Sequence, residues 1–288
     1  MLRALALCYR RKLQWDRSLE YFTRAVQLNP RDTALLGDQE DTLQLMHQLP
    51  VALAVVNKIL EITPADVQML ATKAEVLHQM GDLPAARALL TPLHPETYTY
   101  LLYKQAEQLV FERKFGDAIA KFKVHISEKI PGAPPNYEAQ IRARIAQLSD
   151  WAGDPAAHKL WQDLRAELEP LYSSNTEDGP LVQGLSTALA ALGEKEKAYS
   201  LLKRLIETQM AKNPIDAMQP QVDLARLYAQ CSDKDAAVRE ITMLLRVPSL
   251  LTRVSSGLTP CGIHFVIGRN SKSSARRIDK HSQAPVRN

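Results

Sequence analysis

Apolar residues recur along most of this chain at intervals of three and four, which is the spacing of one face of an α-helix. Short turns that contain Gly or polar residues separate the periodic segments. The pattern continues to about Leu251 and then gives way to a short β-like run and a tail rich in Ser, Lys and Arg. The pattern predicts a protein built from α-helices up to residue 250 and a different kind of segment after it.

The helical segments form a repeat. In each unit, a small residue early in the second of two helices is followed four positions later by a bulky apolar residue. These pairs are Ser18/Phe22, Ala52/Val56, Ala86/Leu90, Ala118/Phe122, Ala157/Trp161, Ala198/Leu202 and Ala237/Ile241, at spacings of 34, 34, 32, 39, 41 and 39 residues. The small residue lets two helix backbones approach, and the bulky residue fills the gap to the next pair. Because a lone helix pair cannot bury its apolar face, we expect the pairs to stack around one continuous core.

The turns inside the pairs carry their own signals. Four glycines fall in such turns, where a positive φ is often required: Gly81, Gly116, Gly153 and Gly193. Acidic residues precede the second helix of the last two units, as Glu194/Glu196 and Asp233/Asp235. We interpret these acids as helix caps, since the N-terminal end of a helix dipole favours negative charge.

The first unit resembles a tetratricopeptide repeat. It matches the pattern of that family at Tyr9, Trp15, Ser18, Phe22, Ala25 and Pro30, and the last unit matches at Tyr228, Ala237 and Ile241. The units between depart from the pattern, because Leu43, Leu77 and Leu109 replace the first-helix aromatic residue and the last three units are longer than 34 residues. The resemblance covers residues 1–250 and implies an all-α fold, a right-handed α-α superhelix of about seven antiparallel helix pairs.

Two stretches interrupt the array. They lie near residues 130–136 and 169–180, and both are rich in Pro, Gly, Ser or Asn. We interpret them as long loops between repeats within one domain, residues 1–250, rather than as domain boundaries.

The resemblance implies a binding function, because the first helices of successive pairs line a concave groove that accepts a peptide or protein segment. Repeat geometry places seven candidates there: Arg3, Leu7, Arg10, Tyr103, Glu107, Phe111 and Arg226. Chaperone-binding members of the family hold a C-terminal carboxylate with Lys, Asn and Arg on these helices. Leu7, Asp41 and Glu75 stand at the Asn place in the first three units, so we do not expect that clamp here.

Motifs for catalysis, cofactors and metals are missing from the sequence. It contains no Gly-rich phosphate loop, no GxSxG, no HExxH and no kinase catalytic-loop motif. The seven histidines form no pair at i, i+4, and the three cysteines form no CxxC. We therefore expect no catalytic, cofactor-binding or metal-binding residue and no small-molecule substrate.

Charge and hydropathy disfavour nucleic acid as a partner and predict no membrane-spanning segment. Residues 251–288 hold seven Lys or Arg and one Asp, so this tail carries +6 while residues 1–250 carry −2. A folded basic face for nucleic acid is thus disfavoured. No apolar run is long enough to span a membrane, and the start lacks the signals of a secretory peptide. We expect a cytoplasmic protein with a protein or peptide partner.

The two ends differ from those of a complete array. Met1 opens inside the first helix of a unit, without the polar cap that solenoids need. The array resembles the C-terminal regions of bacterial serine/threonine kinases, nucleotide cyclases and winged-helix regulators, which often end in a segment similar to WDPLRNDPRFQKLL. A one-base frameshift from Cys261 gives a similar segment with plausible codons, so we expect a frameshifted end. The alternatives are a genuine basic, disordered tail and a tail that binds nucleic acid or a membrane surface.

The favoured hypothesis is a non-catalytic protein-interaction scaffold, a fragment of a larger bacterial signalling protein. The alternative is that the chain is the C-terminal part of a serine/threonine kinase or nucleotide cyclase whose catalytic domain lies upstream. A third hypothesis is nucleic-acid binding through the basic tail.

Overall fold

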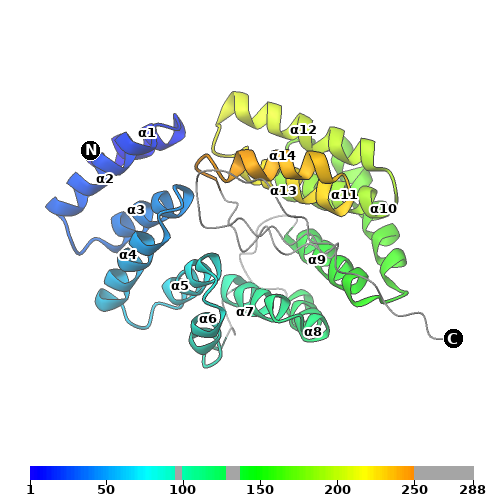
Figure 1. Ribbon diagram of the computed structural model, residues 1–288, viewed down its shortest axis with the longest axis horizontal. Coiled ribbons are helices and arrows are strands. Elements are labelled where there is room, and N and C mark those ends of the chain that lie inside the picture. The colour runs from blue at the N-terminus through cyan, green and yellow to red at the C-terminus, as the bar shows by residue number, and fades with distance from the viewer. Residues whose placement is uncertain (95–98, 128–136, 250–288) are drawn as a thin grey trace.

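The chain folds into consecutive α-helices that follow a curved path (Figure 1). The computed structural model describes residues 1–94, 99–127 and 137–249. Fourteen helices lie in these residues: α1 (Leu2–Arg11), α2 (Trp15–Leu28), α3 (Thr33–Leu45), α4 (Leu49–Ile62), α5 (Val67–Met80), α6 (Leu83–Leu90), α7 (Thr99–Phe111), α8 (Phe115–Ser127), α9 (Tyr137–Ala152), α10 (Ala157–Ser174), α11 (Gly179–Ala191), α12 (Lys195–Lys212), α13 (Met218–Gln230) and α14 (Lys234–Leu244). The predicted all-α repeat superhelix of seven helix pairs is confirmed over these residues.

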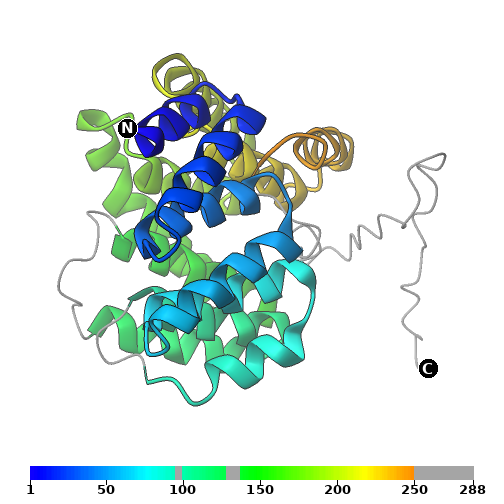
Figure 2. The same cartoon turned by 90° about the vertical axis from the view of Figure 1, so that its left-hand side faces the viewer.

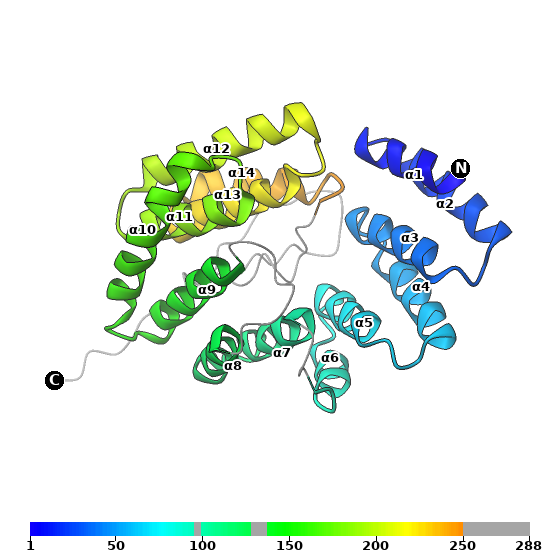
Figure 3. The same cartoon turned by 180° about the vertical axis from the view of Figure 1, so that it is seen from behind.

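The helices form two layers. From α3 to α9, the odd-numbered helices line the inner side of the arc and the even-numbered helices lie outside, as opposite views show (Figures 1 and 3). Each second helix packs against the first helix of the next pair, and α5 contacts α7 just as α11 contacts α9 and α13. The inner surface is therefore built from the first helices of successive pairs.

The small and bulky residues of the repeat are the core. All seven pairs predicted from the sequence are buried, and Phe22, Phe122 and Trp161 are among the largest fully buried side chains. Ser18 replaces the usual alanine, and its buried hydroxyl donates a hydrogen bond to the Ala6 carbonyl at 2.9 Å. Because this polar group has a partner, it can occupy a position meant for a small apolar residue without an unpaired buried donor.

Each pair turns through one residue with positive φ: Leu13, His47, Gly81, Arg113, Gly153, Gly193 and Ser232. The amide after each of these residues donates to the carbonyl five residues earlier at 2.8–2.9 Å, as Gln14 does to Tyr9. This bond is the mark of a Schellman motif, which satisfies carbonyls that the helix end leaves free. The motif fixes where each first helix stops.

The prediction that Gly116 occupies such a turn is wrong. Gly116 is the second residue of α8, and Arg113 holds the positive φ in the fourth pair. The turn needs one left-handed residue, but it does not require that residue to be glycine. The position of a glycine in the sequence was thus an unreliable guide to the turn.

The expected loop over residues 169–180 is also wrong in its first half. Helix α10 continues through Pro170 to Ser174, so only residues 175–178 connect it to α11. Proline removes one amide donor, but Leu164 and Leu168 on the same helix are buried and hold it against the core. Packing therefore overrides the local signal. The other expected loop, 130–136, and the tail 251–288 lie outside the described residues.

Aspartates begin several helices. The side chains of Asp32, Asp66 and Asp178 accept hydrogen bonds from the amides three residues on and so cap α3, α5 and α11. Asp233 caps α14 in the same way, as expected from the sequence. Glu194 is the N-cap residue of α12 and Glu196 lies in its first turn, where the helix dipole favours negative charge, but the Glu194 side chain accepts no capping hydrogen bond.

Candidate functional site

The inner face of the superhelix is the candidate site, because the repeat brings equivalent residues of successive first helices to one surface. The position six residues before each left-handed turn residue is occupied by Leu7, Asp41, Glu75, Glu107, Gln147, Thr187 and Arg226. In three consecutive pairs this position is a carboxylate. Around these residues the inner face holds three polar clusters.

The first cluster links α1 to α3. Arg3 forms an ion pair with Asp38 at 2.5 Å. The Arg10 guanidinium donates to the Asp38 carbonyl and the Thr42 hydroxyl, both at 3.4 Å. Asp41 lies beside them and is solvent-accessible. Although Asp41 is exposed, the protein around its carboxyl group removes part of its hydration and raises its pKa, and the nearby positive charge of Arg10 opposes that rise.

Glu40 adds a buried acid to the first cluster. It is 1% exposed, and its carboxyl group accepts a hydrogen bond from Gln44 at 2.7 Å. Burial, with a smaller contribution from Asp41, raises the pKa of Glu40 to about 8. Glu40 is therefore mostly protonated at pH 7. Glu40 was not among the residues predicted from the sequence, although the other six pairs carry Ala or Ser at the equivalent place, seven residues before the turn residue.

The second cluster surrounds Lys104 of α7. Its ammonium group forms ion pairs with Glu107 at 2.9 Å and Glu75 at 3.2 Å. It also lies 5.1 and 5.6 Å from the ring centres of Tyr100 and Tyr103, within the range of cation–π attraction.

The charges of this cluster stabilise each other. Burial alone would lower the pKa of Lys104, but Glu107 and Glu75 hold it well above its usual value. Burial would likewise raise the pKa of Glu107, yet Lys104 keeps it below normal. Both groups are therefore charged near neutral pH.

His78 lies at the base of the second cluster. Its Nε2 is 2.7 Å from the Gln108 side-chain oxygen, and its ring packs against Phe111 with ring centres 4.9 Å apart. Burial lowers the pKa of His78, although its hydrogen bond to Gln108 opposes this, so the ring is neutral at pH 7. His78 thus serves as a packing and hydrogen-bonding residue.

The third cluster crosses three helices, α9, α11 and α13. Gln140 donates to Gln183 at 3.1 Å, and Gln183 donates to the Asp223 carboxylate at 3.0 Å. Gln219 and Arg226 also donate to Asp223, at 2.9 and 3.4 Å. Burial raises the pKa of Asp223 to about 6, although Arg226 and the amides oppose the rise. This chain of amides joins the fifth, sixth and seventh pairs.

The seven sequence candidates divide among these clusters. Arg3 and Arg10 belong to the first cluster, Tyr103, Glu107 and Phe111 lie in or beside the second, and Arg226 belongs to the third. Leu7 packs against the core of the first pair. Tyr103 also packs on Phe122, with ring centres 5.6 Å apart. Their role in binding stays a prediction.

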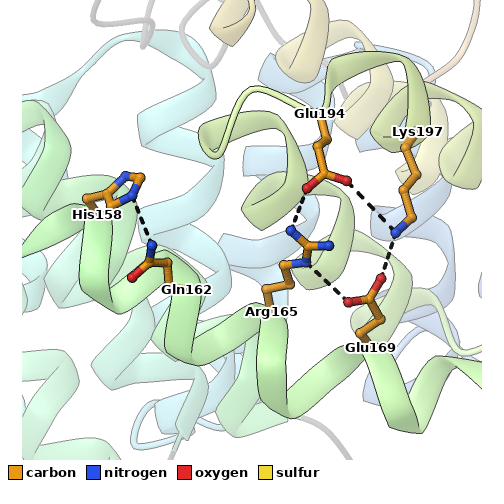
Figure 4. Close-up of polar contacts among 6 residues, drawn as sticks. All are labelled: His158, Gln162, Arg165, Glu169, Glu194 and Lys197. Carbon is orange, nitrogen blue, oxygen red and sulfur yellow. Dashed lines mark hydrogen bonds and ion pairs between the residues drawn. The ribbon is translucent and has the colours of Figure 1, made fainter.

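A fourth polar cluster lies on α10 and the start of α12, at an open surface pocket (Figure 4). Arg165 pairs with Glu169 at 3.1 Å and with Glu194, and Lys197 pairs with Glu169 at 2.6 Å. Lys197, followed by Arg165, holds the pKa of Glu169 below its usual value. Because all four charges are compensated, this cluster joins two helices and presents no free charge of its own.

Among the described residues, no group of three or more His, Cys, Asp or Glu could hold a metal ion. No helix there is long and apolar enough to cross a membrane.

Residues 2–32 match the family described as Tetratricopeptide repeat. The match covers α1 and α2 with the turn that joins them, and the same paired geometry recurs in the following helices. Residues 2–32 of this chain therefore form a tetratricopeptide repeat. No match was found among curated proteins.

Solved structures similar to this chain include a tetratricopeptide repeat protein and two human IFIT1 dimers. A tetratricopeptide repeat protein from Parabacteroides merdae ATCC 43184 is 16% identical, with 90% of this chain and 96% of that chain covered and a TM-score of 0.46. The human IFIT1 dimer with PPP-AAAA is 12% identical, with coverages of 84% and 57% and a TM-score of 0.53. The human IFIT1 dimer with m7Gppp-AAAA is also 12% identical, with coverages of 84% and 56% and a TM-score of 0.54.

The IFIT1 likeness concerns the fold alone. This chain spans little more than half of the IFIT1 chains that it matches. The ligands of the IFIT1 chains therefore do not indicate what this protein binds.

Proposed function

We propose that this tetratricopeptide repeat protein is a non-catalytic scaffold that binds a segment of a protein partner on its inner face. The observation that carries the proposal is the row of inward polar residues on successive first helices, organised into three clusters. Repeat arrays offer such extended concave surfaces to partners. A cytoplasmic location and a larger bacterial signalling protein as parent belong to the same proposal.

Charge balance on the inner face favours a protein partner over a nucleic acid. Most inward cations of the described residues already have an acidic neighbour: Arg3 with Asp38, Lys104 with Glu75 and Glu107, and Arg226 with Asp223. Binding to phosphates needs cations that are free to neutralise them. A partner segment with its own mixed polar groups fits such a surface better than a polyanion does.

The proposal is tested by capture of partners from a lysate of the source organism with the full chain as bait. We expect Asp41→Asn combined with Arg226→Gln to reduce capture at least tenfold, because both side chains are accessible and lie at the repeated inner position. Neither residue is part of the hydrophobic core, so the fold should survive the change.

The matched control changes the same residue types on even-numbered helices, as Asp163→Asn with Arg239→Gln, both exposed. Partners should bind this control as they bind the wild-type protein. Equal capture by the inner-face variant and the control would contradict the assignment of the inner face as the binding surface.

A further inference from the structure

The end of the described chain returns to the second helix pair. The Ser249 amide donates to the Leu45 carbonyl at 2.9 Å. The Ser249 carbonyl lies 3.0 Å from His47 Nε2, and its hydroxyl lies 3.3 Å from the same nitrogen. Ser249 is buried, with 2% of its surface exposed. Its partner His47 lies 202 positions earlier in the chain. We name these contacts among Leu45, His47 and Ser249 the seam.

The chemistry of the seam follows from how α3 ends. Leu45 is the last residue of α3, so its carbonyl has no partner within the helix and is free to accept from Ser249. His47 is the left-handed turn residue of the second pair. Since Ser249 presents a carbonyl to His47 Nε2, that nitrogen carries a proton and donates.

The seam joins the two ends of the arc. In Figures 1 and 2 the first helices, in blue, approach the yellow and orange helices α12 and α14. Nearby, an open crevice lies between the first turn and the α12–α13 connection, lined by Arg11, Lys12, Gln14, Lys212, Asn213 and Pro214. Among described residues, the only hydrogen bonds or ion pairs that link the first two pairs to α12–Ser249 are those of the seam.

Closure at the seam limits access to the inner face. While these contacts hold, a folded partner cannot pass between the two ends of the arc. Among the described residues, the hydrogen bonds that must break for the arc to open there are those of Ser249 with Leu45 and His47. We propose that the seam is a gate: the superhelix opens between Ser249 and the α3–α4 turn to admit a partner segment to the inner face. The part of this inference that concerns the partner rests on the proposed function.

The gate makes a prediction about amide exchange in the absence of any partner. The Ser249 amide is protected by a bond across the seam, whereas the Gln48 amide donates to Leu43 within the same turn. If the seam opens by itself, Ser249 exchanges faster than Gln48 under native conditions. If both amides exchange only together with the core helices, the seam opens only on unfolding, and the gate is excluded.

Two substitutions, His47→Gly and Ser249→Pro, should weaken the seam, each by removing a different hydrogen bond. His47→Gly keeps the left-handed turn and removes the imidazole, so the protection of the Ser249 amide should fall roughly three- to tenfold. Arg113→Gly, the same change in the fourth pair, is the matched control and should leave that protection unchanged. An equal loss in both variants would show that the seam is not the cause.

Ser249→Pro removes the amide that donates to Leu45, and it lies outside the core helices because α14 ends at Leu244. Small-angle X-ray scattering of this variant should give a larger radius of gyration than the wild-type protein, with an unchanged helical signal in circular dichroism. An unchanged radius would contradict closure by the seam. Ser249→Ala keeps the amide and should scatter like the wild-type protein.

Any partner captured on the inner face then tests the second half of the proposal. Its association rate should rise in Ser249→Pro, by about the factor by which the open form gains population. A larger radius with an unchanged association rate would exclude the gate while leaving the proposed function intact. Loss of capture in the Asp41/Arg226 variant, by contrast, bears on the proposed function alone.

Discussion

Four of the seven described turn residues with positive φ are not glycine. A residue with a side chain in the left-handed region costs about 1–2 kcal/mol relative to the right-handed helix. The Schellman bonds at each turn show that the superhelix imposes this conformation whatever the residue. At the scale of single residues, the protein therefore carries backbone strain that a suitable substitution can relieve.

Ser232→Gly should stabilise the protein by about 1 kcal/mol, because Ser232 is exposed and has a φ of 60°. The urea midpoint of unfolding measures the change. Gly193→Ala is the converse control: a Cβ there meets no atom within 4 Å, so its destabilisation reports backbone conformation alone. A lower midpoint for Ser232→Gly would show that the turn is not strained.

Glu40 gives a pH-dependent stability. Its pKa rises from 4.5 in the unfolded chain to about 8 in the folded protein, so the folded state binds the proton more tightly. The stability that this protonation supplies is complete below pH 4.5 and is lost as the pH rises through 8.

Glu40→Gln keeps an acceptor for Gln44 and removes the titration. The variant should therefore gain about 2–4 kcal/mol relative to the wild-type protein between pH 5 and pH 8.5. Urea unfolding at both pH values measures this difference. A constant difference across the range would mean that the Glu40 carboxyl group is not buried in the acid form.

At the scale of elements, the helix pair is the unit of packing. Its second helix meets the first through an alanine that has no exposed surface in five of the seven pairs: Ala52, Ala86, Ala118, Ala198 and Ala237. Such close contact leaves no room for a larger side chain, since protein cores are packed as densely as organic crystals.

Ala198→Trp should therefore overpack the sixth pair and cost roughly 1–3 kcal/mol. The change in the denaturation midpoint measures the cost. Val238→Trp, at an exposed position of α14, is a control that should leave the midpoint nearly unchanged. An unchanged midpoint for Ala198→Trp would contradict the packing of α11 against α12.

At the scale of the whole molecule, the charges are divided between the array and the segment after it. Residues 1–250 carry −2 and residues 251–288 carry +6. Most inward cations of the described part already have acidic neighbours. From this charge distribution we predict that any attraction for polyanions comes from residues 251–288 rather than from the array.

The full chain should bind single-stranded RNA only weakly, and the binding should weaken steeply between 50 and about 200 mM salt. A chain that ends at residue 249 should lose this binding. Fluorescence anisotropy of a labelled RNA measures both. Salt-resistant binding that survives the truncation would contradict the charge balance of the inner face and favour an RNA-binding function.

The sequence by itself determined the number of helix pairs, their core residues and the inner position in each first helix. These features are periodic, and each depends on contacts within one pair or with the next, so local spacing predicts them. Four of the inner-face candidates, Arg3, Arg10, Glu107 and Arg226, were found in polar clusters for the same reason.

The tertiary structure alone decided which distant groups meet. Lys104 receives its partner Glu75 from the preceding pair, and α10 continues through Pro170 because its other residues pack on the core. Ser249 reaches His47 only after seven pairs have each added a small rotation. A small error in the rotation of each pair accumulates over seven pairs. For this physical reason the repeat spacing predicted the helix pairs but did not predict the contact between Ser249 and His47.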